Sequence, residues 1–199
     1  MWYKDQLILT GEQNPDTYEA LYMNVPESYR RGIELTVSSA PLSWFTISAN
    51  ATLSQNKIVD YTEYVYNDDT YTTDAFYIGE STIAYSPSVI AGISLDFHTH
   101  GFAGVWRTQY VGKQYMSNAR QEDQVLDAYF VSNLSFSYSF KLPWVKSASV
   151  GLTIYNLFNE EYENNGYAGS GFYKDGDKKI RYNYSGYAAQ AGTNVLGHI

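Results

Sequence analysis

Apolar and polar residues alternate along residues 43–56, "SWFTISANATLSQN". An apolar side chain stands at every second position from Phe45 to Leu53, with threonine, serine and asparagine between. A period of two is typical of a β-strand with two unlike faces. The polar face carries small neutral groups rather than charges, so the apolar face can meet either a protein core or lipid.

Seven further segments read as strands, and most of them alternate in the same way. None of the segments with ten or more residues shows the 3.6-residue stripe of a helix. We therefore predict an all-β chain with about eight strands. The seven segments are 2–10, 28–39, 87–97, 102–113, 126–140, 147–158 and 192–199.

Short and long connections take turns along the chain. The short ones are residues 40–43, 98–101 and 141–146, and the long ones are 11–27, 57–86, 114–125 and 159–191. An up-and-down membrane barrel has short periplasmic turns and long outer loops, whereas compact soluble domains rarely contain loops of this length. We predict an antiparallel up-and-down transmembrane β-barrel fragment, in closed form or as an open curved sheet.

Composition agrees with strands that contact lipid. Only 17% of the 199 residues are charged, against about a quarter in soluble proteins, and 17% are aromatic, including 21 tyrosines. The net charge of -8 argues against a nucleic-acid partner, and the absence of cysteine excludes disulfides. A strand-like segment follows Met1 directly, where a signal peptide would begin, so we expect either a cytoplasmic protein or a piece of a longer one.

Two stretches resemble the barrel of TonB-dependent outer-membrane receptors, particularly those of Bacteroidetes-like bacteria. They are "MWYKDQLILTGEQN…NVPESYRRGIELTVSSAP" and "VGLTIYNLFNEEYENNG…AGTNVLGHI". In the second, Asn156, Leu157, Phe158 and Tyr162 match the signature of the family's penultimate strand. The resemblance implies that residues 1–199 form the C-terminal strands of such a barrel, without its plug domain.

The same resemblance implies a function. It implies uptake of a metal-chelate (siderophore), cobalamin or glycan across the outer membrane of a Gram-negative cell, with no cofactor and no enzymatic chemistry. The partners would be outer-membrane lipid, the ligand, and the TonB complex through the missing N-terminal part. Two alternatives stay open: a self-contained eight-stranded outer-membrane barrel of structural or adhesive role, and a soluble sugar-binding β-sandwich.

Tyrosines interleave with carboxylates in "DYTEYVYNDDTYTTDAFY", residues 60–77. Tyrosine rings give rigid contact area with a polar tip, which suits sugars or aromatic chelates. A solvated outer loop is the simpler interpretation. The candidate ligand-binding residues are Tyr61, Tyr64, Tyr66, Tyr71 and Tyr77.

Four larger polar residues fall on the polar faces of predicted strands, namely Glu34, Asp96, Arg107 and Gln109. An arginine that faced lipid near the bilayer midplane would cost about 2–4 kcal/mol. We therefore expect these residues to face the barrel lumen, where Arg107 can pair with a carboxylate or contact a plug.

Other motifs do not support chemistry. His98 and His100 provide two ligands at most, so a tight turn is favoured over a metal site. The glycines of "GYAGSGF", residues 166–172, lack the context of a phosphate-binding loop. We predict no catalytic residues and no metal site.

Overall fold

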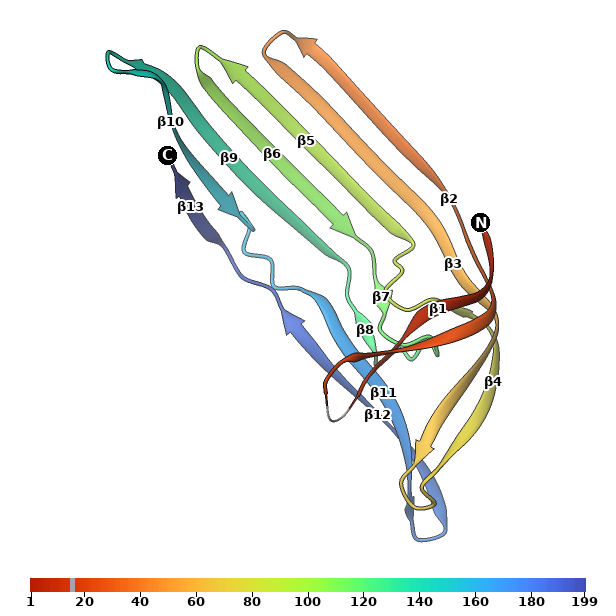
Figure 1. The fold of residues 1–199 in the computed structure, drawn as a ribbon. Helices are drawn as coiled ribbons and strands as arrows, with labels where there is room; N and C mark the ends of the chain where they lie inside the picture. Colours follow the sequence, from red (N-terminus) through yellow and green to blue (C-terminus); the bar gives the residue numbers. More distant parts are fainter. Residues whose placement is uncertain (15–16) are drawn as a thin grey trace.

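The computed structural model describes residues 1–14 and 17–199, and in them the chain is built from β-strands. Within these residues there is no helix of the length and apolar character that a membrane-crossing helix needs. Eight strands lie side by side, each antiparallel to the next (Figure 1). In order across the sheet they are β1 (Trp2–Gln13), β2 (Ala20–Leu42), β3 (Phe45–Asn67), β5 (Val89–Thr99), β6 (Phe102–Val111), β9 (Tyr129–Leu142), β10 (Val145–Tyr155) and β13 (Asn194–His198). The predicted all-β meander of about eight strands is confirmed.

The sheet is open. β1 and β13 are its two outermost strands, and across the described part of the chain they form no backbone pairing with each other. Figure 1 shows the strands as one curved layer with the two ends of the chain on opposite sides. The open curved sheet is therefore the form observed, and the structure does not support a self-contained eight-stranded barrel.

Strand register gathers the apolar residues on one face. One row crosses five strands and consists of Ile47, Leu95, Trp106, Leu134 and Ile154. In the same face of β2, Ile33, Leu35 and Val37 are 62%, 59% and 67% exposed. A β-sandwich would hide such side chains between two sheets about 10 Å apart. These side chains remain exposed, so the sandwich alternative is wrong.

One end of the sheet, which we call the short-turn end, is formed by two-residue turns. They lie between Leu42 and Phe45, between Thr99 and Phe102, and between Leu142 and Val145. At the second turn His100 and Gly101 have φ of 46° and 83°, the positive values of the hairpin turn whose twist suits antiparallel strands. The tight turn expected there is observed. The described residues contain no group of three or more His, Asp and Glu placed to hold a metal ion.

The opposite end, which we call the hairpin end, differs from the prediction. The segments expected as loops continue as paired strands: β4 (Thr72–Thr82) pairs with β3, and β11 (Glu163–Asp175) pairs with β12 (Lys178–Ala189). Tyrosine, threonine and valine favour strands, and they fill β3 beyond Ile58. With 23 residues each, β2 and β3 extend about 75 Å, twice what a membrane strand of about 9–11 residues needs.

The packed interior lies at the hairpin end. One buried cluster consists of Ile8, Val25, Ile58, Tyr61 and Ile83, and a second of Met116, Leu126 and Ala168. The second cluster lies beside the small pair β7 (Gln114–Tyr115) and β8 (Val125–Leu126). Toward the short-turn end no other described element covers the sheet (Figure 1). The two buried clusters lie where the hairpins meet.

Candidate functional site

The four residues predicted to face a lumen lie on one face of the sheet, opposite the apolar rows. Arg107 pairs across strands with Ser94, Gln109 with Gly92, Asp96 with Thr46, and Glu34 with Thr52. Arg107 and Gln109 line a cavity of about 360 Å³ together with Thr36, Asn50 and Asn133. This polar face is therefore concave around Gly92. That it faces a barrel lumen stays a prediction.

Of the two contacts expected for Arg107, with a carboxylate or with a plug, the first is not formed within the described residues. Its side chain is exposed, and it forms no salt bridge in the part of the chain that the structure describes. The nearby carboxylate of Asp96 instead accepts a hydrogen bond from Ser94 Oγ at 2.7 Å. The guanidinium of Arg107 therefore remains available to a group outside this chain.

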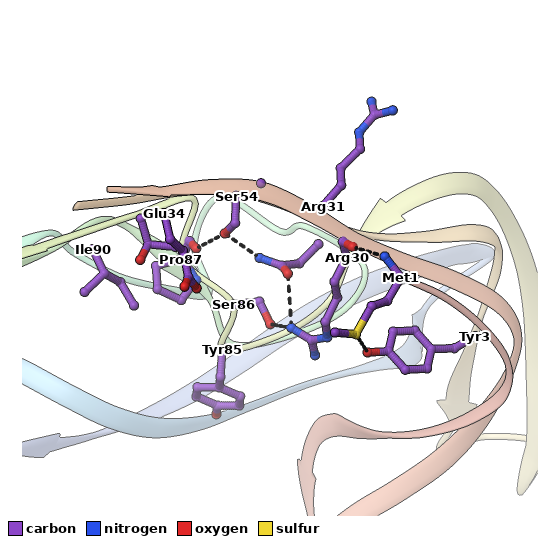
Figure 2. A pocket seen from close by; sticks show the side chains of 13 residues that line it. Met1, Tyr3, Arg30, Arg31, Glu34, Ser54, Tyr85, Ser86, Pro87 and Ile90 are labelled. Atoms are coloured by element: carbon purple, nitrogen blue, oxygen red, sulfur yellow. Dashed lines mark hydrogen bonds between the residues drawn. The ribbon is translucent and has the colours of Figure 1, made fainter. Parts of the chain in front are cut away.

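A larger cavity of about 660 Å³ continues the polar face toward the hairpin end (Figure 2). Its centre is Arg30, whose Nη1 donates to Asn56 Oδ1 and Ser86 Oγ, both at 3.2 Å. Asn56 Nδ2 donates in turn to Ser54 Oγ at 3.0 Å. The side chain of Arg31 extends away from this group (Figure 2), since successive residues of a strand point to opposite faces.

The five candidate tyrosines do not form one group. Tyr61 belongs to the buried cluster, where burial raises the pKa of its phenol. Tyr77 pairs with Thr62, so it lies on the same face of the β3–β4 hairpin as Tyr64 and Tyr66, opposite Tyr61. The side chains of Tyr64, Tyr66 and Tyr77 are 59%, 47% and 72% exposed. Tyr71 lies in the turn and is exposed. Register shifts on both sides of Tyr61 separate it from the others.

A third cavity lies beneath the β1–β2 hairpin, and we call it the rim cavity. Its volume is about 210 Å³, and its lining includes Glu12, Tyr61, Glu63, Ser117 and Gln124. Burial, and after it the neighbouring Glu63, raises the pKa of Glu12. Three separate parts of the chain thus bring polar side chains into one small space.

The family motif forms a hydrogen-bonded turn after β10. Asn156 is 4% exposed with φ of 49°, and its Nδ2 donates to the carbonyls of Glu160 at 2.9 Å and Ala191 at 3.1 Å. Its Oδ1 accepts from Glu160 N, and its carbonyl accepts from Thr193 Oγ1 at 2.6 Å. Asn156 thereby joins the end of β10 to the start of β13.

The other motif residues surround this turn. Leu157 N donates to the Ser132 carbonyl at 2.7 Å, which fixes the turn against β9. The rings of Tyr162 and Tyr129 stand 4.4 Å apart, and Phe158 is 61% exposed. The motif therefore determines how three strands meet, and it presents one aromatic side chain to the surroundings.

Sequence reasoning missed the polar contacts that organise the hairpin end. Arg181 on β12 holds Glu63 on β3, and Asn118 links β1 to the segment after β4 through Leu9 O and Ala84 N. Arg181, Glu63 and Asn118 all lie in segments expected to be loops, and no alternation marks them. Only a three-dimensional arrangement reveals what they hold together.

Comparison with known proteins is consistent with this architecture. A family model described as TonB dependent receptor-like, beta-barrel, matches residues 1–157. No curated protein matches the sequence.

Solved structures with a similar fold include three receptors. The siderophore receptor PiuA from Acinetobacter baumannii has a TM-score of 0.63 and 15% identity, and the match covers 98% of this chain and 24% of that one. The ferric-catecholate import receptor Fiu from E. coli K12 has a TM-score of 0.53 and 14% identity, with 99% of this chain and 24% of that one covered. The ferric yersiniabactin uptake receptor FyuA from Yersinia pestis has a TM-score of 0.51 and 15% identity, with 90% of this chain and 25% of that one covered. This chain spans about a quarter of the length of each. Because the family model covers most of its 199 residues, the chain belongs to the TonB-dependent receptor-like β-barrel family.

Proposed function

We propose that this chain forms part of the barrel wall of an outer-membrane receptor that takes up a metal-chelate of the siderophore class. Cobalamin and glycans are the other ligand classes considered. The proposal is supported by the family and by similarity in fold to three receptors named for siderophores or ferric compounds. As predicted, the family is one of receptors and not of enzymes.

The proposal rests mainly on the two unlike faces of the sheet. Apolar rows cover one face, and serine, threonine and asparagine cover the other, over the nine residues from Phe45 to Leu53. Nine residues suffice for a tilted membrane strand. In the proposed arrangement the apolar rows contact outer-membrane lipid of a Gram-negative cell, and the polar face with Glu34, Asp96, Arg107 and Gln109 lines the lumen.

The remaining parts of the receptor follow from the same proposal. The chain would supply C-terminal strands, while the plug domain and the segment that meets the TonB complex belong to the full-length receptor. The exposed tyrosines Tyr64, Tyr66, Tyr71 and Tyr77 would contact the ligand at the cell surface, and the free guanidinium of Arg107 would meet the plug. Tyr61, being buried, would support the hairpin instead.

Lipid contact can be tested by placing single cysteines, because residues 1–199 contain none. Cysteines at 33, 35 and 37, and at 34, 36 and 38, would be labelled with a small fluorophore in outer membranes that contain the receptor. We expect brominated lipid to quench the odd positions and aqueous iodide to quench the even ones. Equal quenching by iodide at all six positions would contradict the proposal.

Transport can be tested separately in cells. Cells with and without the receptor gene would be given a radioactive ferric siderophore, labelled cobalamin or a labelled oligosaccharide. We expect receptor-dependent uptake of the ferric siderophore that stops when a protonophore removes the membrane potential. Receptor-dependent uptake of one of the other two ligands alone would replace the siderophore by that class.

A further inference from the structure

Two residues that line the rim cavity each carry a buried polar atom without a partner in the described part of the chain. Gln124 is 1% exposed and Ser117 is 8% exposed, and both line the cavity. Gln124 Oε1 and Ser117 Oγ have no hydrogen-bond partner among the described residues. Because an unsatisfied buried polar group costs about 1–3 kcal/mol, a native site that keeps two of them together calls for an explanation.

The orientation of the Gln124 amide is fixed by its surroundings. Its Nε2 donates to the Gly169 carbonyl at 2.6 Å and lies 3.3 Å from the Tyr184 carbonyl. A flipped amide would place an oxygen against two carbonyl oxygens, so the free atom is the acceptor Oε1. The first unpartnered group of the cavity is therefore an acceptor.

The charge of the cavity is also unbalanced. Among the described residues that line it, Glu12 and Glu63 are the only charged ones. Both oxygens of Glu63 accept hydrogen bonds from Arg181, at 2.6 and 2.9 Å. Glu12 has no salt bridge in the described chain, so one partly buried carboxylate lacks a cation.

Other polar groups in the lining are already engaged. Thr10 Oγ1 donates to the Leu21 carbonyl and accepts from Glu12 N, both at 3.1 Å. Ser170 Oγ donates to Asn183 Oδ1 and accepts from Arg181. The buried or partly buried positions that remain open are thus the Glu12 carboxylate and the two oxygens, Gln124 Oε1 and Ser117 Oγ, that have no partner among the described residues.

We propose that the rim cavity binds a primary ammonium group, with the carboxylate of Glu12 as counter-charge and with Gln124 Oε1 and Ser117 Oγ as acceptors. An –NH₃⁺ group has three donors and no acceptor, which matches the three open positions in number and sign. At about 210 Å³ the cavity holds one functional group rather than a drug-sized molecule, which needs about 300–1,000 Å³. This assignment is independent of the proposed transport function, because it concerns binding to the chain itself.

Binding can be measured on the full chain, folded in detergent, with n-propylammonium as the probe at pH 7. The NH₂ resonances of the Gln124 side chain report directly on the site. We expect them to shift saturably with a dissociation constant of about 1 mM, as for a weak fragment. Tetramethylammonium, which has charge but no N–H donor, and 1-propanol, which has no charge, should leave them unchanged.

Two variants test the named contacts. Glu12→Gln removes the counter-charge at constant shape, and Ser117→Ala removes an oxygen that bonds to no described residue, so neither should prevent folding. We expect each to weaken propylammonium binding at least tenfold, and the matched control Glu27→Gln, at an exposed position of the neighbouring strand, to bind as the parent does.

The proposal is overturned by any of three results. They are no saturable shift at about 100 mM probe, as when ordered water alone fills the cavity; equal binding of tetramethylammonium; or undiminished binding in both variants. A receptor that fails to transport but still binds propylammonium would reject only the proposed function, and the reverse result would reject only the ammonium site.

Discussion

Arg181 on β12 holds Glu63 on β3 through two parallel hydrogen bonds, Nη2 to Oε1 at 2.6 Å and Nη1 to Oε2 at 2.9 Å. The two residues are 118 positions apart in the sequence. A planar guanidinium matches a carboxylate in this bidentate way, whereas an ammonium cannot. The pair therefore fixes the β11–β12 hairpin against the extended part of β3.

Replacing Arg181 should loosen that hairpin. Since charge-assisted hydrogen bonds contribute about 1.5–3 kcal/mol, we expect Arg181→Lys to lower the local opening free energy of β11 and β12 by about 2 kcal/mol. Amide hydrogen exchange in the hairpin should then accelerate about thirtyfold, while exchange in β5 and β6 stays unchanged. Lys178→Ala, at the exposed turn of the same hairpin, is the control, and equal acceleration in both variants would contradict this role.

A second contact between the hairpins should be lost in acid. The hydrogen bond from Lys179, and after it the bond from Asn67, lowers the pKa of Asp74 below 3.8. A carboxyl group whose folded pKa is depressed stabilises the fold above its unfolded pKa, and this contribution disappears as the pH falls through the folded value. We expect carbon-13 titration of the Asp74 carboxyl to give a midpoint below 3.8, and Lys179→Ala to return the midpoint toward that value.

Two substitutions of Asn156 separate the contribution of its side-chain hydrogen bonds from that of backbone strain. Asn156→Ala removes three side-chain hydrogen bonds, two donated and one accepted from Glu160 N, and also forces alanine into positive φ. Asn156→Gly removes the same bonds without the backbone strain. We expect both variants to lower the free energy of unfolding, measured by urea titration of the protein folded in detergent. The loss should be smaller for glycine than for alanine by about 1 kcal/mol.

Asn156→Asp tests the donors of that turn. Aspartate keeps the acceptor for Glu160 N and tolerates positive φ, but it places a carboxylate oxygen against the carbonyls of Glu160 and Ala191. We expect it to destabilise the fold at pH 7 by at least about 2 kcal/mol, and less at a pH where it is protonated. Parent-like stability at pH 7 would show that the two donated bonds are unimportant.

Gly11 closes the β1–β2 hairpin onto the segment after β7. Its φ is 98°, and a Cβ there would overlap the carbonyl oxygen of Met116. Gly176 also has a positive φ, 62°, but a Cβ added there would meet nothing within 4 Å. Gly11→Ala should therefore lower the free energy of unfolding by about 1–3 kcal/mol more than Gly176→Ala does. Urea titration of both variants measures this difference. Equal costs would mean that backbone strain alone acts at Gly11.

The sequence predicted what depends on local periodicity. The strand from Phe45 to Leu53 could be recognised because its alternation is unbroken, and the turn at His100–Gly101 because a short polar segment interrupts two such strands. The continuation of β3 could not be recognised, since register shifts around Tyr61 break the period and the tyrosines resemble a ligand-binding loop as much as a strand.

The candidate site depends on contacts across long sequence distances. The family motif was found by resemblance, but the sequence alone does not show that Asn156 donates to Glu160 and Ala191. Gln124 reaches Gly169, 45 positions away, from a segment with no alternation. Buried polar residues in connecting segments carry no periodic signal, so their role emerges only when the hairpins are seen to meet.

The opposite directions of the two edge strands restrict any assembly that contains this sheet. β1 runs toward the hairpin end and β13 runs toward the short-turn end, as follows from the unbroken antiparallel order. A ring that closes through antiparallel neighbours only must therefore insert an even number of further strands between them. A closed ring with an odd number of strands would need at least one pair of parallel neighbours. That pair would include at least one of the added strands, because the eight strands that lie side by side are each antiparallel to the next.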